Sequence, residues 1–197
     1  MNLLEGLTAL GLKKLFLQLL RQKTILIVGL GEIGSRLSRL AKVFGMKVIA
    51  VKNDIQEHKG IVDEIYRPEK INDLLEMADF IVLCCPLTER TENLIDGKAF
   101  SQMRPSSYLI NVARGGCVEE KALLEALIEG QIAGAAIDHF RQEPLSPTSP
   151  FWEIPNLIIT PHSAGETAKY EGKLLDVLLE NINRLYAKKM NLINQVL

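Results

Sequence analysis

The sequence predicts an α/β fold in which a doubly wound parallel sheet carries helices on both faces. Three observations lead to this prediction: short apolar runs recur along the chain, amphipathic helical patterns separate them, and a glycine-rich turn follows the first run. Short apolar runs bounded by turn residues are typical of strands buried on both faces of a parallel sheet. Strands that alternate with helices are the pattern of βαβ units.

The first half of the chain alternates strand and helix. We expect these elements over 24–28 (strand), 33–44 (helix), 47–51 (strand), 71–77 (helix) and 79–84 (strand). The apolar residues of the first helix share one face: Ile33, Leu37, Leu40 and Phe44. Gly45 stands where a glycine commonly ends a helix. Residues 53–68 are polar, and we expect them to be irregular.

The same alternation continues in the second half. We expect elements over 107–112 (strand), 119–128 (helix), 132–137 (strand), 157–160 (strand) and 166–188 (helix). The proline-containing stretch 141–156 predicts a surface loop before the last strand.

The length of 197 residues allows one good-sized domain. We place that domain over residues 22–165 and expect flanking helices over 1–21 and 166–197. The leucines near the N-terminus recur at near-helical spacing, which indicates a helix that buries one face. A mitochondrial presequence is the weaker interpretation, because the segment contains Glu5 and no arginine before Arg21.

Composition excludes several classes of partner and site. A net charge of -1 gives no reason to expect nucleic acid or an anionic membrane as a partner. The three cysteines, Cys84, Cys85 and Cys117, form no disulfide framework, which predicts a reducing, cytoplasmic location. The sequence has no CxxC or HxxxH spacing, so we expect no metal site.

The glycine turn is the strongest functional signal. Gly29, Gly31 and Gly34 match the pattern GxGxxG, directly after a predicted strand and at the start of a predicted helix. In a Rossmann fold the first glycine allows the sharp turn, the second lets a pyrophosphate approach, and the third lets helix and strand pack closely. The free N–H groups at the helix N-terminus then favour the phosphates. The alternative is a glycine-rich turn without a ligand.

The end of the second strand bears on the choice between NAD and NADP. An acidic residue at this position binds the ribose hydroxyls of NAD. Here Lys52 takes the position, followed by Asn53 and Asp54. A lysine favours the extra phosphate of NADP, whereas Asp54 could still reach the ribose. Lys52 could also be an ordinary surface residue, so the cofactor is predicted as NAD or NADP.

Chemically useful residues follow three other predicted strands. Arg114 follows one strand, Asp138 ends the next with Glu143 nearby, and His162 follows the last. Ligands bind at the carboxyl ends of such strands. An arginine can bind a carboxylate with two hydrogen bonds, and a histidine held by a glutamate can transfer a proton near neutral pH. The alternative is that these residues are surface charges and a loop cap.

Five motifs in order resemble the cofactor domain of the D-isomer-specific 2-hydroxyacid dehydrogenases, a family that includes phosphoglycerate and glycerate dehydrogenases. The resemblance runs from about Lys23 to Asn183. Its motifs are V-G-L-G-E-I-G, C-P-L-T-E-R-T, N-V-A-R-G-G, A-I-D-H-F-R-Q-E-P-L and T-P-H-S-A-G.

The resemblance implies a role for each matching residue. Arg114 would bind the carboxylate and carbonyl of a 2-oxo acid, Glu143 and His162 would form the acid–base pair, and Asp138 would contact the nicotinamide amide. With Asp138, the predicted cofactor contacts are Gly29, Gly31, Glu32, Ile33, Gly34, Lys52, Cys85, Pro86, Thr88, Val112, Ala113, Ser163 and Gly165.

Two departures from the family stand out. Lys52 replaces the acid of NAD-dependent members, and only about twenty residues precede the first strand, where the family has most of its substrate domain. We therefore expect a fragment or a shortened gene product, with residues 166–197 resembling the segment that returns to the substrate domain. The leading function is an oxidoreductase that transfers a hydride between NAD(P) and a small 2-hydroxy or 2-oxo acid. The alternative is a non-catalytic NAD(P)-binding module, such as a co-repressor.

The flanking segments predict self-association. Residues 1–20 and 166–197 each carry an apolar face, and such faces are usually covered. Family members commonly dimerise through this region. We therefore expect the two segments to pack together or across a homodimer.

Overall fold

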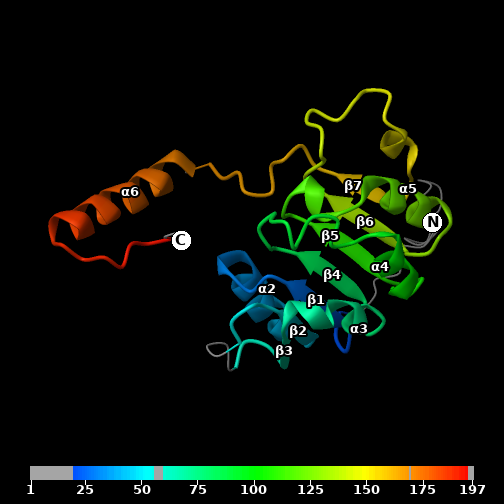
Figure 1. The fold of residues 1–197 in the computed structure, drawn as a ribbon, viewed down its shortest axis with the longest axis horizontal. Coiled ribbons are helices and arrows are strands. Elements are labelled where there is room, and N and C mark those ends of the chain that lie inside the picture. The colour runs from blue at the N-terminus through cyan, green and yellow to red at the C-terminus, as the bar shows by residue number, and fades with distance from the viewer. Residues whose placement is uncertain (1–19, 56–59, 169, 195–197) are drawn as a thin grey trace, which may run out of the picture. The chain divides into compact units, whose positions relative to one another are not determined.

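The computed structural model describes residues 20–55, 60–168 and 170–194 (Figure 1). The predicted N-terminal helix therefore lies outside the described residues, apart from its last two positions. The chain divides into two compact units, the first ending at Pro161 and the second beginning at His162. Among the described residues, the first unit contains the sheet and the second contains one long helix.

The sheet of the first unit is parallel throughout its seven described strands, as predicted. Its strands are β1 (Thr24–Val28), β2 (Lys47–Val51), β3 (Glu64–Tyr66), β4 (Phe80–Leu83), β5 (Tyr108–Asn111), β6 (Gly134–Ile137) and β7 (Leu157–Ile159). They lie in the order β3-β2-β1-β4-β5-β6-β7. From β1, the chain adds β2 and β3 on one side of the sheet. It then returns and adds β4 to β7 on the other side. This reversal is the topological switch point of a doubly wound Rossmann sheet.

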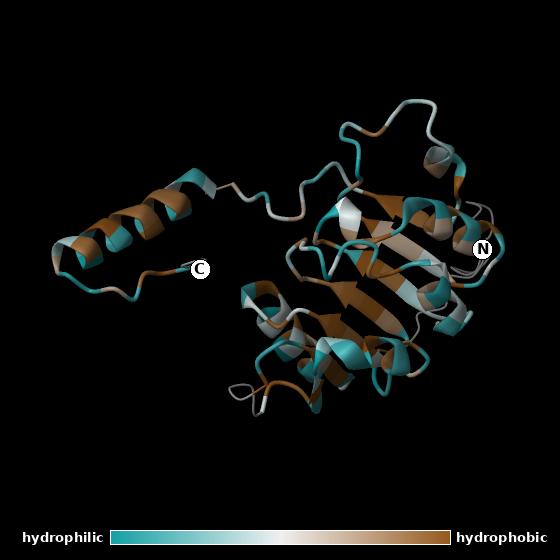
Figure 2. Cartoon of the chain, in the orientation of Figure 1, coloured by the Kyte–Doolittle hydropathy of each residue, from teal (hydrophilic) through white to brown (hydrophobic). Residues whose placement is uncertain are grey.

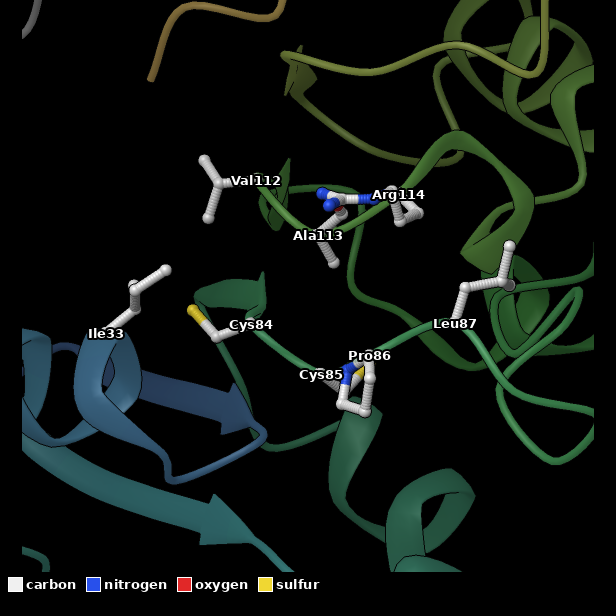
Figure 3. Close-up of a pocket in the computed structure, with 8 residues that line it drawn as sticks. All are labelled: Ile33, Cys84, Cys85, Pro86, Leu87, Val112, Ala113 and Arg114. Carbon is white, nitrogen blue, oxygen red and sulfur yellow. The ribbon is translucent and has the colours of Figure 1, made fainter. Parts of the chain in front are cut away.

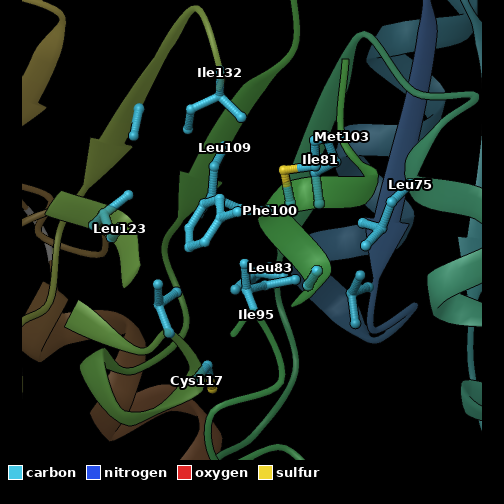
Figure 4. Packing of buried hydrophobic residues seen from close by; sticks show 14 of the residues in the cluster. Leu75, Ile81, Leu83, Ile95, Phe100, Met103, Leu109, Cys117, Leu123 and Ile132 are labelled. Atoms are coloured by element: carbon cyan, nitrogen blue, oxygen red, sulfur yellow. The ribbon is translucent and has the colours of Figure 1, made fainter. Parts of the chain in front are cut away.

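Helices lie on both faces of the sheet. They are α2 (Glu32–Val43), α3 (Ile71–Leu75), α4 (Gly97–Gln102) and α5 (Glu120–Ile128), with short 3₁₀ turns at Pro68–Lys70, Gly115–Cys117 and Pro150–Glu153. Leu26 and Val28 of β1 face a large core that contains Phe100 of α4 and Leu123 of α5 (Figure 4). Alternate strand residues face the smaller core beneath α2. Most strands are hydrophobic along their length, as expected for strands buried on both faces (Figure 2).

The helix α2 packs on the sheet through small residues. Its buried positions are Gly34, Ser38 and Ala41, and the Ser38 hydroxyl donates to the Gly34 carbonyl at 2.8 Å. The apolar face predicted from the sequence is mostly outward, since Ile33, Leu40 and Phe44 are exposed. Small residues allow a closer approach of helix and strand than the larger ones would.

Two elements were missing from the sequence prediction. The strand β3 lies inside the stretch that we expected to be irregular, and α4 was not predicted. β3 has three half-buried residues, of which Glu64 and Tyr66 are polar, so no apolar run marks it. α4 is only six residues long and begins with glycine, although Asp96 caps it by accepting a hydrogen bond from the Ala99 N–H.

A partly buried carboxylate joins the start of β1 to β4. Asp79 accepts hydrogen bonds from the Lys23 ammonium at 2.8 Å and from the Thr24 N–H at 2.9 Å. Burial alone would raise the pKa of Asp79, but these hydrogen bonds and the Lys23 charge outweigh it and lower the pKa. A lowered pKa in the folded state means that the stabilisation is present above pH 4 and is lost as the pH falls through the folded-state pKa.

We expect Asp79→Asn to lower the free energy of unfolding by about 1–3 kcal/mol at pH 7, because hydrogen bonds to a charged group are lost. The difference from wild type should shrink as the pH falls below about 4, where Asp79 of the wild type takes up a proton. Urea unfolding at several pH values measures both effects. The control is Asp73→Asn, which removes the exposed Lys70–Asp73 pair and should cost little. A deficit independent of pH would contradict the assignment.

The second unit consists of residues 162–197. Its helix α6 spans Tyr170–Tyr186, somewhat less than the 166–188 predicted. From within α6, the Asn181 side chain accepts the N–H of Ile193 at 2.7 Å and donates to its carbonyl at 3.0 Å, which ties the segment after the helix back to it. Among the residues that the structure describes, no helix combines the length and hydrophobicity that crossing a membrane requires.

Candidate cofactor and substrate site

Most site candidates of the first unit lie at the switch point of the sheet. β1 and β4 are neighbours, and β5 lies beside β4. The carboxyl ends of these three parallel strands lie at one edge, where open α/β sheets bind their ligands. The segments that leave this edge are the glycine turn, the Pro86 loop (residues 84–94) and the Arg114 turn (residues 112–117).

The first and third glycines of the turn have no room for a side chain. Gly29 has a φ of 98°, and a Cβ atom there would lie 2.8 Å from the backbone of Cys84. A Cβ atom at Gly34 would lie 2.1 Å from the Gly29 carbonyl oxygen. The sharp turn and the close packing of helix on strand therefore both require glycine.

Gly31 differs from these two glycines. A Cβ atom there would meet no described heavy atom within 4 Å. Gly31 is also the N-cap of α2, and no described side chain caps that helix end. A helix N-terminus with uncapped N–H groups and open space before it can accept a phosphate. The turn thus fits the pyrophosphate of a dinucleotide.

A cavity of about 430 Å³ lies beside the turn (Figure 3). Its wall comprises Ile33, Cys84, Cys85, Pro86, Leu87, Val112, Ala113 and Arg114. Six of these eight residues were predicted as site residues, and Cys84 and Leu87 were missed. Both are sequence neighbours of the predicted Cys85–Pro86 pair, which was the available signal. The wall is mostly apolar, and Arg114 is the one charged residue among those that line it. Apolar side chains suit a planar ring, and an arginine suits an anionic group beside that ring.

The cysteines of the cavity wall are neutral packing groups at neutral pH. Burial raises the pKa of the Cys84 thiol to about 11. The pKa of the Cys85 thiol is raised as well, mainly by a hydrogen bond to Cys117 and to a smaller extent by burial. All three cysteines are free thiols.

The Pro86 loop is shaped by Thr91. Its hydroxyl donates to the Pro86 carbonyl at 2.7 Å and accepts the Thr88 N–H at 2.7 Å. Thr88, a predicted cofactor contact, is exposed in this loop. The threonine at 91 therefore fixes the bend that presents Pro86 and Leu87 to the cavity.

The Arg114 turn is held by a residue that the sequence prediction did not include. Asn111 is fully buried at the end of β5, where its amide nitrogen donates to the Arg114 carbonyl and its amide oxygen accepts the Ala113 N–H, both at 3.0 Å. The Arg114 guanidinium is exposed and donates to the Ala113 carbonyl at 2.8 Å. Asparagine side chains commonly hold turns by bonding the backbone a few residues further on. The motif N-V-A-R therefore offered a signal for this role of Asn111.

Asp138 and Glu143 lie in the Glu143 loop (residues 138–144), which follows β6. The Asp138 carboxylate is buried and accepts a hydrogen bond from the Thr160 hydroxyl at 2.5 Å. The buried His139 imidazole lies between two carboxylates, 3.4 Å from Asp138 and 3.7 Å from Glu143. Glu143 also accepts the Phe140 N–H at 3.3 Å. The sequence analysis did not single out His139, although it lies inside the motif A-I-D-H-F-R-Q-E-P-L.

The remaining predicted residues of the first unit are Lys52 and Glu32. Lys52 follows β2 directly and is half-buried, with its N–H bonded to the Tyr66 carbonyl. Glu32 is exposed in the first turn of α2 and pairs with Arg36 at 3.4 Å. His162, Ser163 and Gly165 belong to the second unit, so the predicted pairing of His162 with Glu143 stays a prediction. His162 has a φ of 55°, a left-handed conformation that costs backbone energy.

Comparison with known proteins agrees with this geometry. Residues 9–164 match the family described as D-isomer specific 2-hydroxyacid dehydrogenase, NAD binding domain. A glyoxylate reductase of Korarchaeum cryptofilum is 35% identical over 179 residues, which cover 88% of this chain and 52% of that protein. The chain thus spans about half the length of this relative.

Solved structures give the same result. The NADPH-dependent glyoxylate/hydroxypyruvate reductase of Sinorhizobium meliloti, in complex with NADP and sulfate, superposes with a TM-score of 0.83 at 28% identity, over 97% of this chain and 62% of that one. A D-isomer specific 2-hydroxyacid dehydrogenase of Lactobacillus delbrueckii, in its NAD complex, gives 0.75 at 30% identity, over 86% and 54%. The chain therefore belongs to the D-isomer specific 2-hydroxyacid dehydrogenase family, and residues 9–164 correspond to its NAD-binding domain.

Proposed function

We propose that this chain forms the cofactor half of an NAD(P)-dependent oxidoreductase acting on a small 2-hydroxy or 2-oxo acid. The observation that carries the proposal is the tight glycine turn next to an apolar cavity that ends at Arg114. The turn supplies N–H groups for the pyrophosphate, and the cavity supplies an apolar wall for the nicotinamide. When bound, the nicotinamide supplies or accepts a hydride at its C4 atom.

Arg114 is the group that we assign to the substrate. Its guanidinium donates several N–H bonds in one plane, which matches a carboxylate and an adjacent carbonyl. Asn111 fixes the backbone on both sides of Arg114, so the guanidinium starts from a defined place at the cavity rim. Such positioning lowers the entropy cost of bringing the reacting carbon to the cofactor.

The proton transfer is assigned to His162, with Glu143 as its partner. Reduction of a carbonyl requires a proton at the oxygen, and a histidine can deliver it near neutral pH. A carboxylate beside the imidazole favours the protonated form. The buried Asp138 carboxylate can accept a hydrogen bond from the nicotinamide amide, which would select one face of the ring.

Either cofactor is compatible with the end of β2. Lys52 favours the additional phosphate of NADP, and the Sinorhizobium relative is an NADPH-dependent enzyme. The Lactobacillus relative was solved with NAD. We therefore propose NAD or NADP and a cytoplasmic location, the latter because all three cysteines are free thiols.

The test of turnover uses the full chain with NADH or NADPH and one of three acids: glyoxylate, hydroxypyruvate or phosphohydroxypyruvate. We expect the absorbance at the nicotinamide band to fall only when an acid is present. Binding of the dinucleotide without oxidation, for all three acids, would instead support the second candidate. That candidate is a nucleotide-binding module, which needs only the glycine turn and the cavity of the first unit.

We propose that the chain forms a homodimer. The helix α6 exposes a row of apolar side chains that includes Leu174, Leu178 and Leu185 (Figure 2). Exposed apolar rows of this kind commonly mark an interface. Sedimentation at micromolar concentration should give twice the mass of 22.0 kDa expected for one chain. A single species at the mass of the monomer would contradict this proposal.

A further inference from the structure

The Arg141 side chain bonds to two segments that border the candidate site. It lies in the Glu143 loop, between Asp138 and Glu143. Its guanidinium bonds the Asn93 side-chain oxygen at 2.5 Å and the Gly116 carbonyl at 3.2 Å. These two bonds come from Nη2, and Nη1 pairs with the Glu92 carboxylate at 3.3 Å. One side chain thus joins the Glu143 loop to the Pro86 loop and to the Arg114 turn.

The backbones of these segments also touch. A Cβ atom at Gly115 would lie 2.2 Å from the carbonyl carbon of Phe140, so the Arg114 turn packs directly on the Glu143 loop. The Asn93 N–H donates to the Gly116 carbonyl at 2.8 Å, the same oxygen that accepts from Arg141. The Arg141 N–H donates to the Glu120 carboxylate at 2.6 Å, at the start of α5. The three segments therefore meet around Gly116.

The guanidinium is the group suited to this junction. It carries five N–H donors in a fixed planar fork, so it can bond three acceptors on two segments at once. A lysine at 141 could keep the ion pair with Glu92, but its point-like ammonium could not reproduce the fork. The Arg141 and Glu92 side chains are 39% and 56% exposed, so the ion pair alone contributes little to stability.

We propose that Arg141 is a positioning residue, which holds the Glu143 loop at a fixed distance from the Arg114 turn. The inference rests on the proposed function for its catalytic consequence, because Arg114 and Glu143 are the groups assigned there to substrate and proton transfer. Arg141 contacts neither reacting group directly. Its effect is to keep Arg114 and Glu143 in one arrangement relative to the Pro86 loop, which forms part of the cavity wall.

The variants Arg141→Ala and Arg141→Lys test this proposal in the full chain. The matched control is Arg104→Ala, which removes an exposed arginine from the segment before β5, at the opposite edge of the sheet. Hydrogen exchange is measured on peptides that cover 88–95 and 113–118. We expect faster exchange of these peptides in Arg141→Ala than in Arg104→Ala, with both variants folded by circular dichroism.

Kinetics supply the second readout. We expect kcat/KM for the 2-oxo acid to fall about 10- to 100-fold in Arg141→Ala, while the dissociation constant for NADPH changes by less than about threefold. Arg141→Lys should recover only a small part of the loss. A merely structural role would lower the melting temperature without this split between turnover and cofactor affinity.

The exchange measurement separates this proposal from the proposed function. If the wild-type chain oxidises no dinucleotide with any acid, the proposed function fails, and the exchange of 88–95 and 113–118 still decides whether Arg141 joins the segments. Unchanged exchange in Arg141→Ala overturns the proposal. Full recovery by Arg141→Lys overturns it as well, because the fork would then be unnecessary.

Discussion

The His162→Gln variant is expected to lose turnover by about 10²- to 10⁴-fold, the range in which general acid–base catalysis contributes. Glutamine has a similar length and can donate a hydrogen bond, but it cannot deliver a proton. The affinity for the dinucleotide should stay unchanged, because the glycine turn and the cavity belong to the first unit and do not include His162. Steady-state kinetics and a fluorescence titration measure the two quantities separately.

The control for this variant is Glu171→Gln, an exposed substitution in the first turn of α6 in the same unit. It should leave both quantities at the wild-type level. Turnover that persists in His162→Gln would remove His162 from the mechanism. A parallel loss of cofactor affinity would assign His162 to binding rather than to proton transfer.

The glycine turn predicts opposite effects for two neighbouring substitutions. Gly34→Ala would force a Cβ atom against the Gly29 carbonyl oxygen, so we expect a loss of about 3 kcal/mol or more in the free energy of unfolding. Gly31→Val points into open space, so we expect a loss of no more than about 1 kcal/mol, from the helix N-cap. The same side chain would occupy the space of the pyrophosphate and weaken dinucleotide binding by on the order of 100-fold.

Urea unfolding and fluorescence titration of both variants test this contrast. Gly172→Ala is the control, since a Cβ atom there also meets no heavy atom within 4 Å and the residue lies in α6 of the second unit. It should leave the free energy of unfolding near the wild-type value. A Gly31→Val protein that binds NADH as tightly as wild type would show that phosphates do not approach this turn.

The apolar runs and the glycine pattern were sufficient to predict a doubly wound parallel sheet. β1 and β4 are continuous apolar segments, and their periodicity needs no tertiary information. The burial pattern of α2 could not be predicted in the same way. Its larger apolar residues suit a buried face, but the narrow space above β1 admits only Gly34, Ser38 and Ala41. Tertiary packing therefore decided which face of this helix is buried.

The sequence motifs predicted most residues of the cavity but not the contacts that hold its loops together. Pro86, Val112 and Arg114 were predicted by motif and do line one cavity. Arg141 was not predicted, because an arginine in a polar loop resembles a solvated surface charge. Its contacts to Asn93 and Gly116 bridge 48 and 25 positions of sequence. Such contacts follow from the fold, so periodicity and spacing cannot reveal them.

The central claim is that the turn at Gly29, Gly31 and Gly34 binds the pyrophosphate of NAD or NADP. Titration of the full chain with NADH and with NADPH, followed by nicotinamide fluorescence, tests it most directly. The account predicts a saturable change with at least one of them, and its loss in Gly31→Val. No saturable change with either, up to about 1 mM, would contradict the account.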